Sequence, residues 1–410
     1  MMQGGFHLEL RSKSIGEGVR REVCLSQEGS SDKKKIFYEI SGAAGAVDPP
    51  VLDGFALGVL LIAMMAGKAL FVHGAMSRSA LYNLDLLQSC WALWRPQRYR
   101  RIEIRPDRVV DLEAAKPGRP AISAFSGGAD STFTLLRHAT KRGGMASHNL
   151  RAAVMVHGFD VRLSKPEHFS KLLELRAPLL RELKLDLRTI RTNVKEQGLQ
   201  NWEDAHGLMV ASCLHQFADE FEFGLIASGD PYHELLLPWG SNPITDHLYS
   251  GDRLTVVHDG AGNPKVEKIA LISQFPAAME GLHVCFENTE EYRNCGRCGK
   301  CINSRLAFMA VGKNNPPCFD APLSLEQIKA IKVGTVRGYN RLRMLANYAE
   351  GHGVEGEWLR IVRRRLRAYE RKGIARGLRA AFESRTISAL NRLGLKEAVK
   401  RNLRATKPDG

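Results

Sequence analysis

The chain has 410 residues, which is enough for two or three domains with a large hydrophobic core. Hydrophobic residues make up 44% of it and charged residues 25%, values that are ordinary for a soluble globular chain. The net charge of +15 is not ordinary, and residues 321–410 carry 21 Lys and Arg against 8 Asp and Glu. Most of the excess positive charge therefore lies in the last 90 residues.

The first residues contain no basic segment followed by an apolar core, so no signal peptide is predicted. The most apolar segment, Gly54 to Met65, has only about 12 residues before Gly67 and Lys68, whereas a membrane-spanning helix needs about 20. We therefore expect a buried helix there, a cytoplasmic protein and no membrane partner. In a reducing compartment, clustered cysteines favour a metal site over disulfides.

The N-terminal part contains no recognisable chemical motif. Residues 1–34 are polar and glycine-rich, and we expect a partly mobile N-terminus there. Residues 35–115 alternate apolar strands and helices, which predicts a small α/β cap domain. The expected strands are 36–40, 69–73 and 101–104, and the expected helices are 52–67 and 77–94. Proline and glycine between Lys116 and Pro120 indicate a domain boundary.

The segment from Ala121 to Ala139, AISAFSGGADSTFTLLRHA, is expected to form a strand, a glycine turn and a helix. Consecutive glycines let the backbone approach an anion, and the amides at the start of a helix favour negative charge. Neighbouring hydroxyl groups add donors. The segment predicts a phosphate-binding loop, and the alternative is a Gly-Gly turn with an ordinary helix cap. It matches neither GxxxxGK[ST] nor GxGxxG, so neither a P-loop NTPase nor a Rossmann dehydrogenase is indicated.

Strands and helices alternate after this loop. Strands are expected at 151–159, 187–194 and 221–228, and helices at 164–183 and 202–217. Repeated βα units predict a parallel sheet with helices on both faces, and such sheets bind ligands beyond the carboxyl ends of their strands. The residues at those ends form the predicted nucleotide pocket: His157, Gly158, Phe159, Thr192, Asn193, Ser228, Gly229 and Asp230.

Four of the eight cysteines are grouped: Cys285, Cys295, Cys298 and Cys301. The last three form two overlapping CxxC units, and a glycine follows the first two of them, which frees the backbone to wrap an ion. This spacing predicts a closed site of four thiolates around a structural Zn²⁺, with Cys285 as the fourth ligand and Cys318 as a less suitable substitute. An iron–sulfur cluster and a redox dithiol are the alternatives.

The motif SGGADS, followed much later by NCGRCGKC with an upstream cysteine, resembles the 7-cyano-7-deazaguanine synthase branch of the PP-loop (N-type) ATP pyrophosphatases. The resemblance covers roughly residues 120–312. It implies a five-stranded parallel sheet of the adenine-nucleotide-hydrolase type, ATP and Mg²⁺ as cofactors, and a structural Zn²⁺ near the mouth of the active site. It also implies adenylation of a carboxylate that is then exchanged for nitrogen. Carried over by position, the ATP phosphates would be held by Ser126, Gly127, Gly128, Ala129, Asp130, Ser131 and Thr132.

The catalytic candidates are Asp130, Ser131, Asp246 and Lys268. The resemblance suggests Asp130, Ser131 and Lys268, whereas Asp246 belongs to a polar segment that differs from the family. Asp130 would lie near Mg²⁺, and residues 157–159 would lie against adenine and ribose. Lys268 resembles the basic residue that follows the last core strand in the family, where it could neutralise charge on the α-phosphate and pyrophosphate. A surface lysine on an amphipathic segment is the alternative.

The chain departs from the family in residues 237–250, LPWGSNPITDHLYS. The substrate-site candidates there are Trp239, Ser241, Asn242 and Asp246, and we expect a substrate other than that of the deazaguanine enzyme. The chain also has an additional basic helical extension at residues 321–410, with Leu359, Val362, Leu366 and Tyr369 on one helical face. Further cations follow at Arg376, Arg379, Arg392, Lys400 and Arg401. This extension is a solvated face or, alternatively, a surface for a phosphate backbone or an acidic partner.

Together these patterns predict an α/β enzyme with an N-terminus at 1–34, a cap domain at 35–115, an ATP pyrophosphatase domain at 120–318 and a helical extension at 321–410. The expected reaction converts ATP to AMP and pyrophosphate while a carboxylate or carboxamide oxygen is adenylated. That oxygen belongs to a small molecule, a protein or a nucleic acid. The alternatives are a tRNA-modifying PP-loop enzyme and a non-catalytic nucleotide-binding subunit of a bacterial defence or polysaccharide system.

Overall fold

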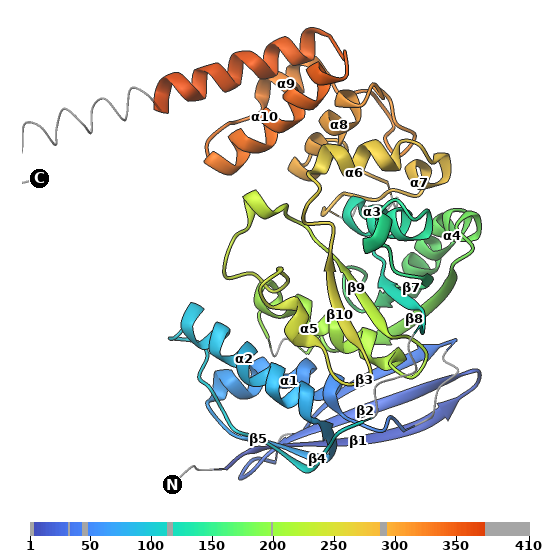
Figure 1. Cartoon of the computed structure of the whole chain (residues 1–410), viewed down its shortest axis with the longest axis vertical. Helices are drawn as coiled ribbons and strands as arrows, with labels where there is room; N and C mark the ends of the chain where they lie inside the picture. The colour runs from blue at the N-terminus through green and yellow to red at the C-terminus, as the bar shows by residue number, and fades with distance from the viewer. Residues whose placement is uncertain are drawn as a thin grey trace, which may run out of the picture. The chain divides into compact units, whose positions relative to one another are not determined.

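The structure, a computed structural model, describes residues 4–31, 33–42, 48–112, 118–197, 200–287 and 293–373. Contacts divide the chain into two units, Met1–Pro322 and Leu323–Gly410. The first unit is built on one ten-stranded mixed sheet, and the second is helical in its described part. Figure 1 shows the elements of each unit.

The strand order across the sheet is β10-β9-β6-β7-β8-β3-β2-β1-β4-β5. The first five in this order are mutually parallel. They are β6 (Ala121–Ala124), β7 (Leu150–His157), β8 (Asp186–Thr192), β9 (Phe223–Ala227) and β10 (Thr255–Asp259). The other half joins β1 (Phe6–Ile15), β2 (Gly18–Gln27) and β3 (Lys33–Ser41) in antiparallel pairs. It ends with β4 (Leu70–Ser77) and β5 (Ile104–Val110), which run parallel to β1.

The predicted fold, a five-stranded parallel sheet with a separate small α/β domain, was wrong. Strand β3 pairs antiparallel with β8, placing Tyr38 opposite Thr192 and Ile40 opposite Ile190, so the two halves form one sheet. The physical reason is that β8 would otherwise be the unpaired edge strand of the parallel half. If β8 were outermost, its backbone N–H and C=O groups would lack partners, and β3 satisfies them.

The hairpin of β1 and β2 lies in the segment to which the sequence analysis assigned no strand. Its residues alternate, since Leu8, Val23 and Leu25 are buried while Glu9 and Arg11 on the other face are exposed. Such alternation is typical of a strand with one solvated face. The many charged residues of that face make the segment polar on average, which hides the period of two.

Helices cover both faces of the parallel half. Helices α1 (Asp53–Ala66) and α5 (Trp202–Leu214) share one core with β3, β7 and β8, and α2 (Arg78–Trp94) joins it. Helices α3 (Ala129–Ala139) and α4 (Pro166–Glu182) lie on the other face (Figure 1). Helix α3 packs against α6 (Lys265–Ile272), α4 against α7 (Pro276–Glu280), and α6 against α8 (Gly299–Ala310). Among the described helices, none combines the length and the apolar character needed to cross a bilayer.

The second unit contains α9 (Leu325–Ala330), α10 (Val336–Gly351) and a further helix at 357–373. Leu359, Val362 and Leu366 of the predicted apolar face are buried. Arg363 donates through Nε to Glu350 at 2.7 Å, so part of the basic surface pairs internally. The five cations predicted between Arg376 and Arg401 lie outside the described residues.

The continuous sheet predicts one cooperative unfolding transition for the first unit. Ile190 is fully buried at the junction of β8 and β3, so Ile190→Ala should lower the free energy of unfolding by about 2–5 kcal/mol. Leu175→Ala removes the same number of carbon atoms from a side chain that is 39% exposed and should cost less than about 1 kcal/mol. Urea denaturation, followed by tryptophan fluorescence and circular dichroism, measures both changes in the free energy of unfolding. Two separate unfolding transitions within the first unit would contradict a shared hydrophobic core.

Candidate functional site

The carboxyl ends of β6, β7, β8, β9 and β10 meet at one edge of the sheet, because these strands are parallel. The glycine loop leaves β6 at this edge and enters α3. Residues 157–159, Thr192 and residues 228–229 follow or end the neighbouring strands at the same edge. These predicted residues and the glycine loop therefore lie along the same carboxyl edge of the parallel strands.

The glycine loop has an unusual backbone and an uncapped helix start. Gly127 has a φ of +76°, in the left-handed region that favours glycine. Gly128 is the N-cap of α3, and no side chain caps this helix. The hydroxyls of Ser126 and Ser131 lie 3.2 Å apart, and Ser131 Oγ also donates to Gly128 O at 3.2 Å. The Thr132 amide already donates to Gly128 O at 2.9 Å, so the earlier amides of the first turn are the ones that an anion could bind.

Two lysines converge on Asp130 in the first turn of α3. Lys268 Nζ lies 2.9 Å from Asp130 Oδ1, and Lys265 Nζ lies 3.1 Å from Oδ2. Lys268 is only 1% exposed and also donates to Ser228 O at 2.6 Å, at the end of β9. Sequence reasoning missed Lys265, although its spacing of three residues from Lys268 on a helix would place both on one face.

The charges of this cluster shift one another's pKa values. Burial lowers the pKa of the Lys268 ammonium, and Asp130 partly opposes this effect. Burial alone would raise the pKa of the Asp130 carboxyl, but Lys265 and Lys268 outweigh it and hold the pKa below its usual range. The site thus has two ammonium groups and one carboxylate beside the helix terminus, a net positive charge suited to a polyphosphate.

The other residues at the edge mainly support the backbone. His157 is buried, with Nε2 2.9 Å from Arg162 O and its ring stacked on Phe169. A Cβ on Gly158 would lie 1.8 Å from Thr192 O, which explains the glycine there. Gly229, in contrast, has open space where a Cβ would be, so a ligand could approach its backbone.

Asp246 lies in a buried network of its own segment. Its Oδ2 accepts from Ser241 Oγ at 2.7 Å and lies 2.7 Å from His258 Nδ1, while Oδ1 accepts from Asn242 N at 2.9 Å. The side chain is fully buried. These contacts fasten residues 241–246 to β10, and they occupy both carboxylate oxygens.

The four predicted cysteines form a compact cluster. Their Sγ atoms all lie within 4.8 Å of one another, with Cys285 and Cys298 3.9 Å apart and Cys295 and Cys301 3.8 Å apart. A tetrahedral zinc with Zn–S bonds of about 2.3 Å separates its sulfurs by about 3.8 Å, so these thiols fit such an ion. The cluster could therefore hold a metal ion such as zinc, with Cys285 in the fourth position.

Hydrogen bonds from backbone and side-chain amides fix the two segments that carry these cysteines, residues 282–285 and 294–301. The Cys298 amide donates to Cys295 Sγ at 3.3 Å and the Cys301 amide to Cys298 Sγ at 3.5 Å. The Asn294 side chain accepts from the Cys285 amide at 3.1 Å and donates to Cys318 O at 2.9 Å. Cys318 thus contributes its carbonyl group to the supporting network.

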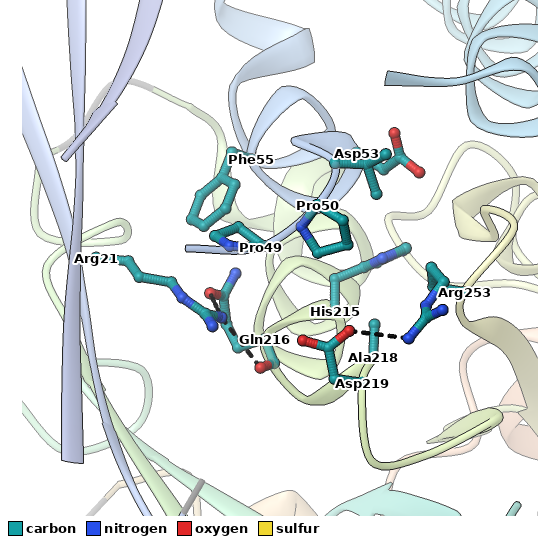
Figure 2. Close-up of a pocket in the computed structure, with 12 residues that line it drawn as sticks. Arg21, Pro49, Pro50, Asp53, Phe55, His215, Gln216, Ala218, Asp219 and Arg253 are labelled. Atoms are coloured by element: carbon teal, nitrogen blue, oxygen red, sulfur yellow. Dashed lines mark hydrogen bonds and ion pairs between the residues drawn. The ribbon is translucent and has the colours of Figure 1, made fainter. Parts of the chain in front are cut away.

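A pocket that the sequence analysis did not predict lies at the opposite edge of the sheet (Figure 2). Its lining includes Arg21, Pro49, Pro50, Asp53, His215, Gln216, Asp219 and Arg253. Asp219 and Arg253 precede β9 and β10, so the pocket is at the amino ends of the strands. Several of its polar groups bond to one another: Arg21 Nη1 donates to Gln216 Oε1 at 3.1 Å, and Arg253 Nη2 lies 3.1 Å from Asp219 Oδ1. These contacts explain the pocket as a junction between the two halves of the sheet.

Gly127→Ala should disrupt the glycine loop. The new Cβ would lie 1.8 Å from the Nε atom of Arg176, and alanine disfavours a φ of +76°. We expect a loss of about 2 kcal/mol or more in the free energy of unfolding, measured by urea denaturation. Gly334→Ala is the matched control, since a Cβ there meets open space. Equal stability of the two variants would contradict this geometry.

The metal site makes a second prediction. Elemental analysis of the purified protein should find about one zinc per chain and no iron. Cys285→Ser should lose most of the metal, because it removes one of four ligands. Cys318→Ser should keep it, and loss of metal from this control instead would show that Cys318 is the ligand.

Comparison of the chain with protein-family models, curated proteins and solved structures gave no match. The resemblance to the PP-loop pyrophosphatases therefore depends on the two motifs and their spacing. The local geometry described above is the independent ground on which a function can be proposed.

Proposed function

We propose that the protein is an ATP-dependent enzyme that forms AMP and pyrophosphate while it adenylates a carboxylate or carboxamide oxygen. The observation that carries this proposal is the cluster at the start of α3. There an uncapped helix terminus, a glycine loop and two lysines lie together at the carboxyl edge of parallel strands. This combination favours a polyphosphate over an uncharged ligand.

In this proposal the first-turn amides and the hydroxyls of Ser126 and Ser131 bind the β- and γ-phosphates. Asp130 would be the carboxylate nearest to Mg²⁺, and the ion would compete with Lys265 and Lys268 for its oxygens. Lys268 then donates to oxygens of the α-phosphate, where negative charge develops as the bond between the α- and β-phosphates breaks.

The first chemical step needs no acid or base from the protein when the substrate is a carboxylate. Its oxygen attacks the α-phosphorus, an acyl-adenylate forms, and pyrophosphate leaves with the bonding electrons. A nitrogen nucleophile or water then attacks the carbonyl carbon, AMP leaves with the electrons of the acyl–oxygen bond, and the proton of the nucleophile passes to solvent. Positioning and electrostatic stabilisation supply the rate of the first step. Zn²⁺ in the cysteine cluster would support the structure, because four thiolates leave no open coordination position.

The direct test is an analysis of the products from ATP labelled at the γ-phosphate, with pools of candidate carboxylates and amides as substrate. Labelled pyrophosphate and unlabelled AMP are expected, and labelled orthophosphate with ADP would refute the proposal. Equilibrium binding of ATP·Mg²⁺ by calorimetry should accompany turnover and should weaken in Gly127→Ala.

Lys268→Met should lower the rate of pyrophosphate formation by about 100-fold, the usual effect of removing a donor from a developing negative charge. Lys265→Met is the matched control, because Lys265 pairs with the same carboxylate but its side chain is 30% exposed. We expect less than a tenfold effect from it. Equal rates in the two variants would exclude a special role for the buried lysine.

A further inference from the structure

The carbonyl groups of the glycine loop are turned into the protein by two different partners. Arg176 Nη2 donates to Ser126 O at 2.9 Å, and the His283 amide donates to Gly127 O at 2.9 Å. In a trans peptide the C=O and the following N–H point in opposite directions. Fixing these two carbonyls therefore directs the amides of Gly127 and Gly128 away from Arg176 and His283, although Gly128 N also makes a 3.3 Å contact with Ser126 Oγ.

Arg176 places a positive charge directly behind the loop. It extends from α4, is 1% exposed, and donates through Nη1 to Leu172 O at 2.9 Å. Its Nε is buried and has no hydrogen-bond partner within the described structure. Burial lowers the pKa of its guanidinium to about 10, so the group is still a cation at neutral pH. Sequence reasoning missed Arg176, because only the fold brings the middle of α4 beneath the loop.

The second partner belongs to the metal-site segment. His283 is two residues before Cys285, and the Asn294 side chain accepts from the amides of Val284 at 2.7 Å and Cys285 at 3.1 Å. Asn294 Nδ2 donates to Leu282 O at 2.9 Å, and Asn294 directly precedes Cys295. Asn294, next to Cys295, therefore holds residues 282–285, the short segment that carries both the His283 amide and Cys285.

We propose that Arg176 and His283 are positioning residues that preset the glycine loop, and that a metal ion in the four-cysteine cluster keeps His283 in place. An ion would link Cys285 to residues 295–301, whereas without it only hydrogen bonds hold these two segments together. Losing the ion releases the His283 amide from Gly127 O and lets the loop leave its left-handed turn. The order of the phosphate loop then depends on metal occupancy. This inference rests on the proposed function only for the identity of the loop's ligand.

Hydrogen exchange measured by mass spectrometry tests the link on the full chain without ATP. Removing zinc with a chelator should make the amides of Ser126 and Gly128 exchange about tenfold faster, because a turn that is no longer fixed at Gly127 O loses their hydrogen bonds to Ser131 Oγ and Ser126 Oγ. Peptides from β7, β9 and α2 should be unchanged, and adding Zn²⁺ should restore protection. Unchanged loop exchange, with faster exchange in 283–301, would overturn the proposal. Equal acceleration throughout the sheet would overturn it too, because the metal would then hold the whole fold.

A pair of variants at His283 separates the amide from the side chain. His283→Pro removes the N–H that binds Gly127 O, while His283→Ala keeps it. In protein with equal zinc content, the loop of the proline variant should exchange about tenfold faster and that of the alanine variant should match the natural protein. Equal behaviour of the two would overturn the role of the amide. If the proline variant does not fold, the zinc-removal experiment still decides.

These experiments and the test of the proposed function can fail separately. Loop exchange is measured without nucleotide, so a protein that binds no ATP can still show the metal dependence. Conversely, a protein that forms pyrophosphate but shows no change in loop exchange on metal loss would keep its proposed function and lose this link.

Discussion

The buried ammonium group of Lys268 connects the parts of the candidate site. It reaches from α6 to Asp130 at the start of α3 and to Ser228 O at the end of β9. A buried charge without partners is costly, so these contacts constrain where the three elements can lie relative to one another. The same group faces the helix terminus on which the proposed phosphate chemistry depends. The Lys268 side chain therefore both constrains these three elements and has the proposed catalytic role.

The ten-stranded sheet explains why the N-terminal half cannot be treated as an independent cap. Strand β3 satisfies the backbone groups of β8, and residues from both halves share one hydrophobic core. The carboxyl edge of the parallel strands carries the glycine loop. At the amino ends of the parallel strands, Arg21 of β2 donates a hydrogen bond to Gln216 after α5, which adds a polar contact between the two halves of the sheet. The N-terminal strands thus stabilise the sheet that carries the candidate site.

The cysteine cluster lies close in sequence and in space to the groups that shape the loop. Cys285 is two residues from His283, whose amide binds the loop, and Arg176 fixes the neighbouring carbonyl from α4. A closed thiolate site beside an active site would usually be described only as a stabilising element. Here the cysteines and the loop share a hydrogen-bonded segment, which would connect a bound metal to the proposed phosphate site.

The sequence by itself determined the local elements whose residues interact with near neighbours. The strand, glycine turn and helix at 121–139 follow from apolar patterning and glycine, and the four-cysteine cluster follows from CxxC spacing. The alternation of βα units placed the predicted pocket residues at the ends of parallel strands, where the structure has them.

Only the tertiary structure decided the rest, because it depends on pairs of residues far apart in the chain. The pairing of β3 with β8 joins residues separated by about 150 positions, and no local pattern encodes that choice. The same holds for Lys268 with Asp130 and for Arg176 beneath Gly127. Local preference fixes which elements form, whereas burial and hydrogen-bond satisfaction across the whole core fix which of them meet.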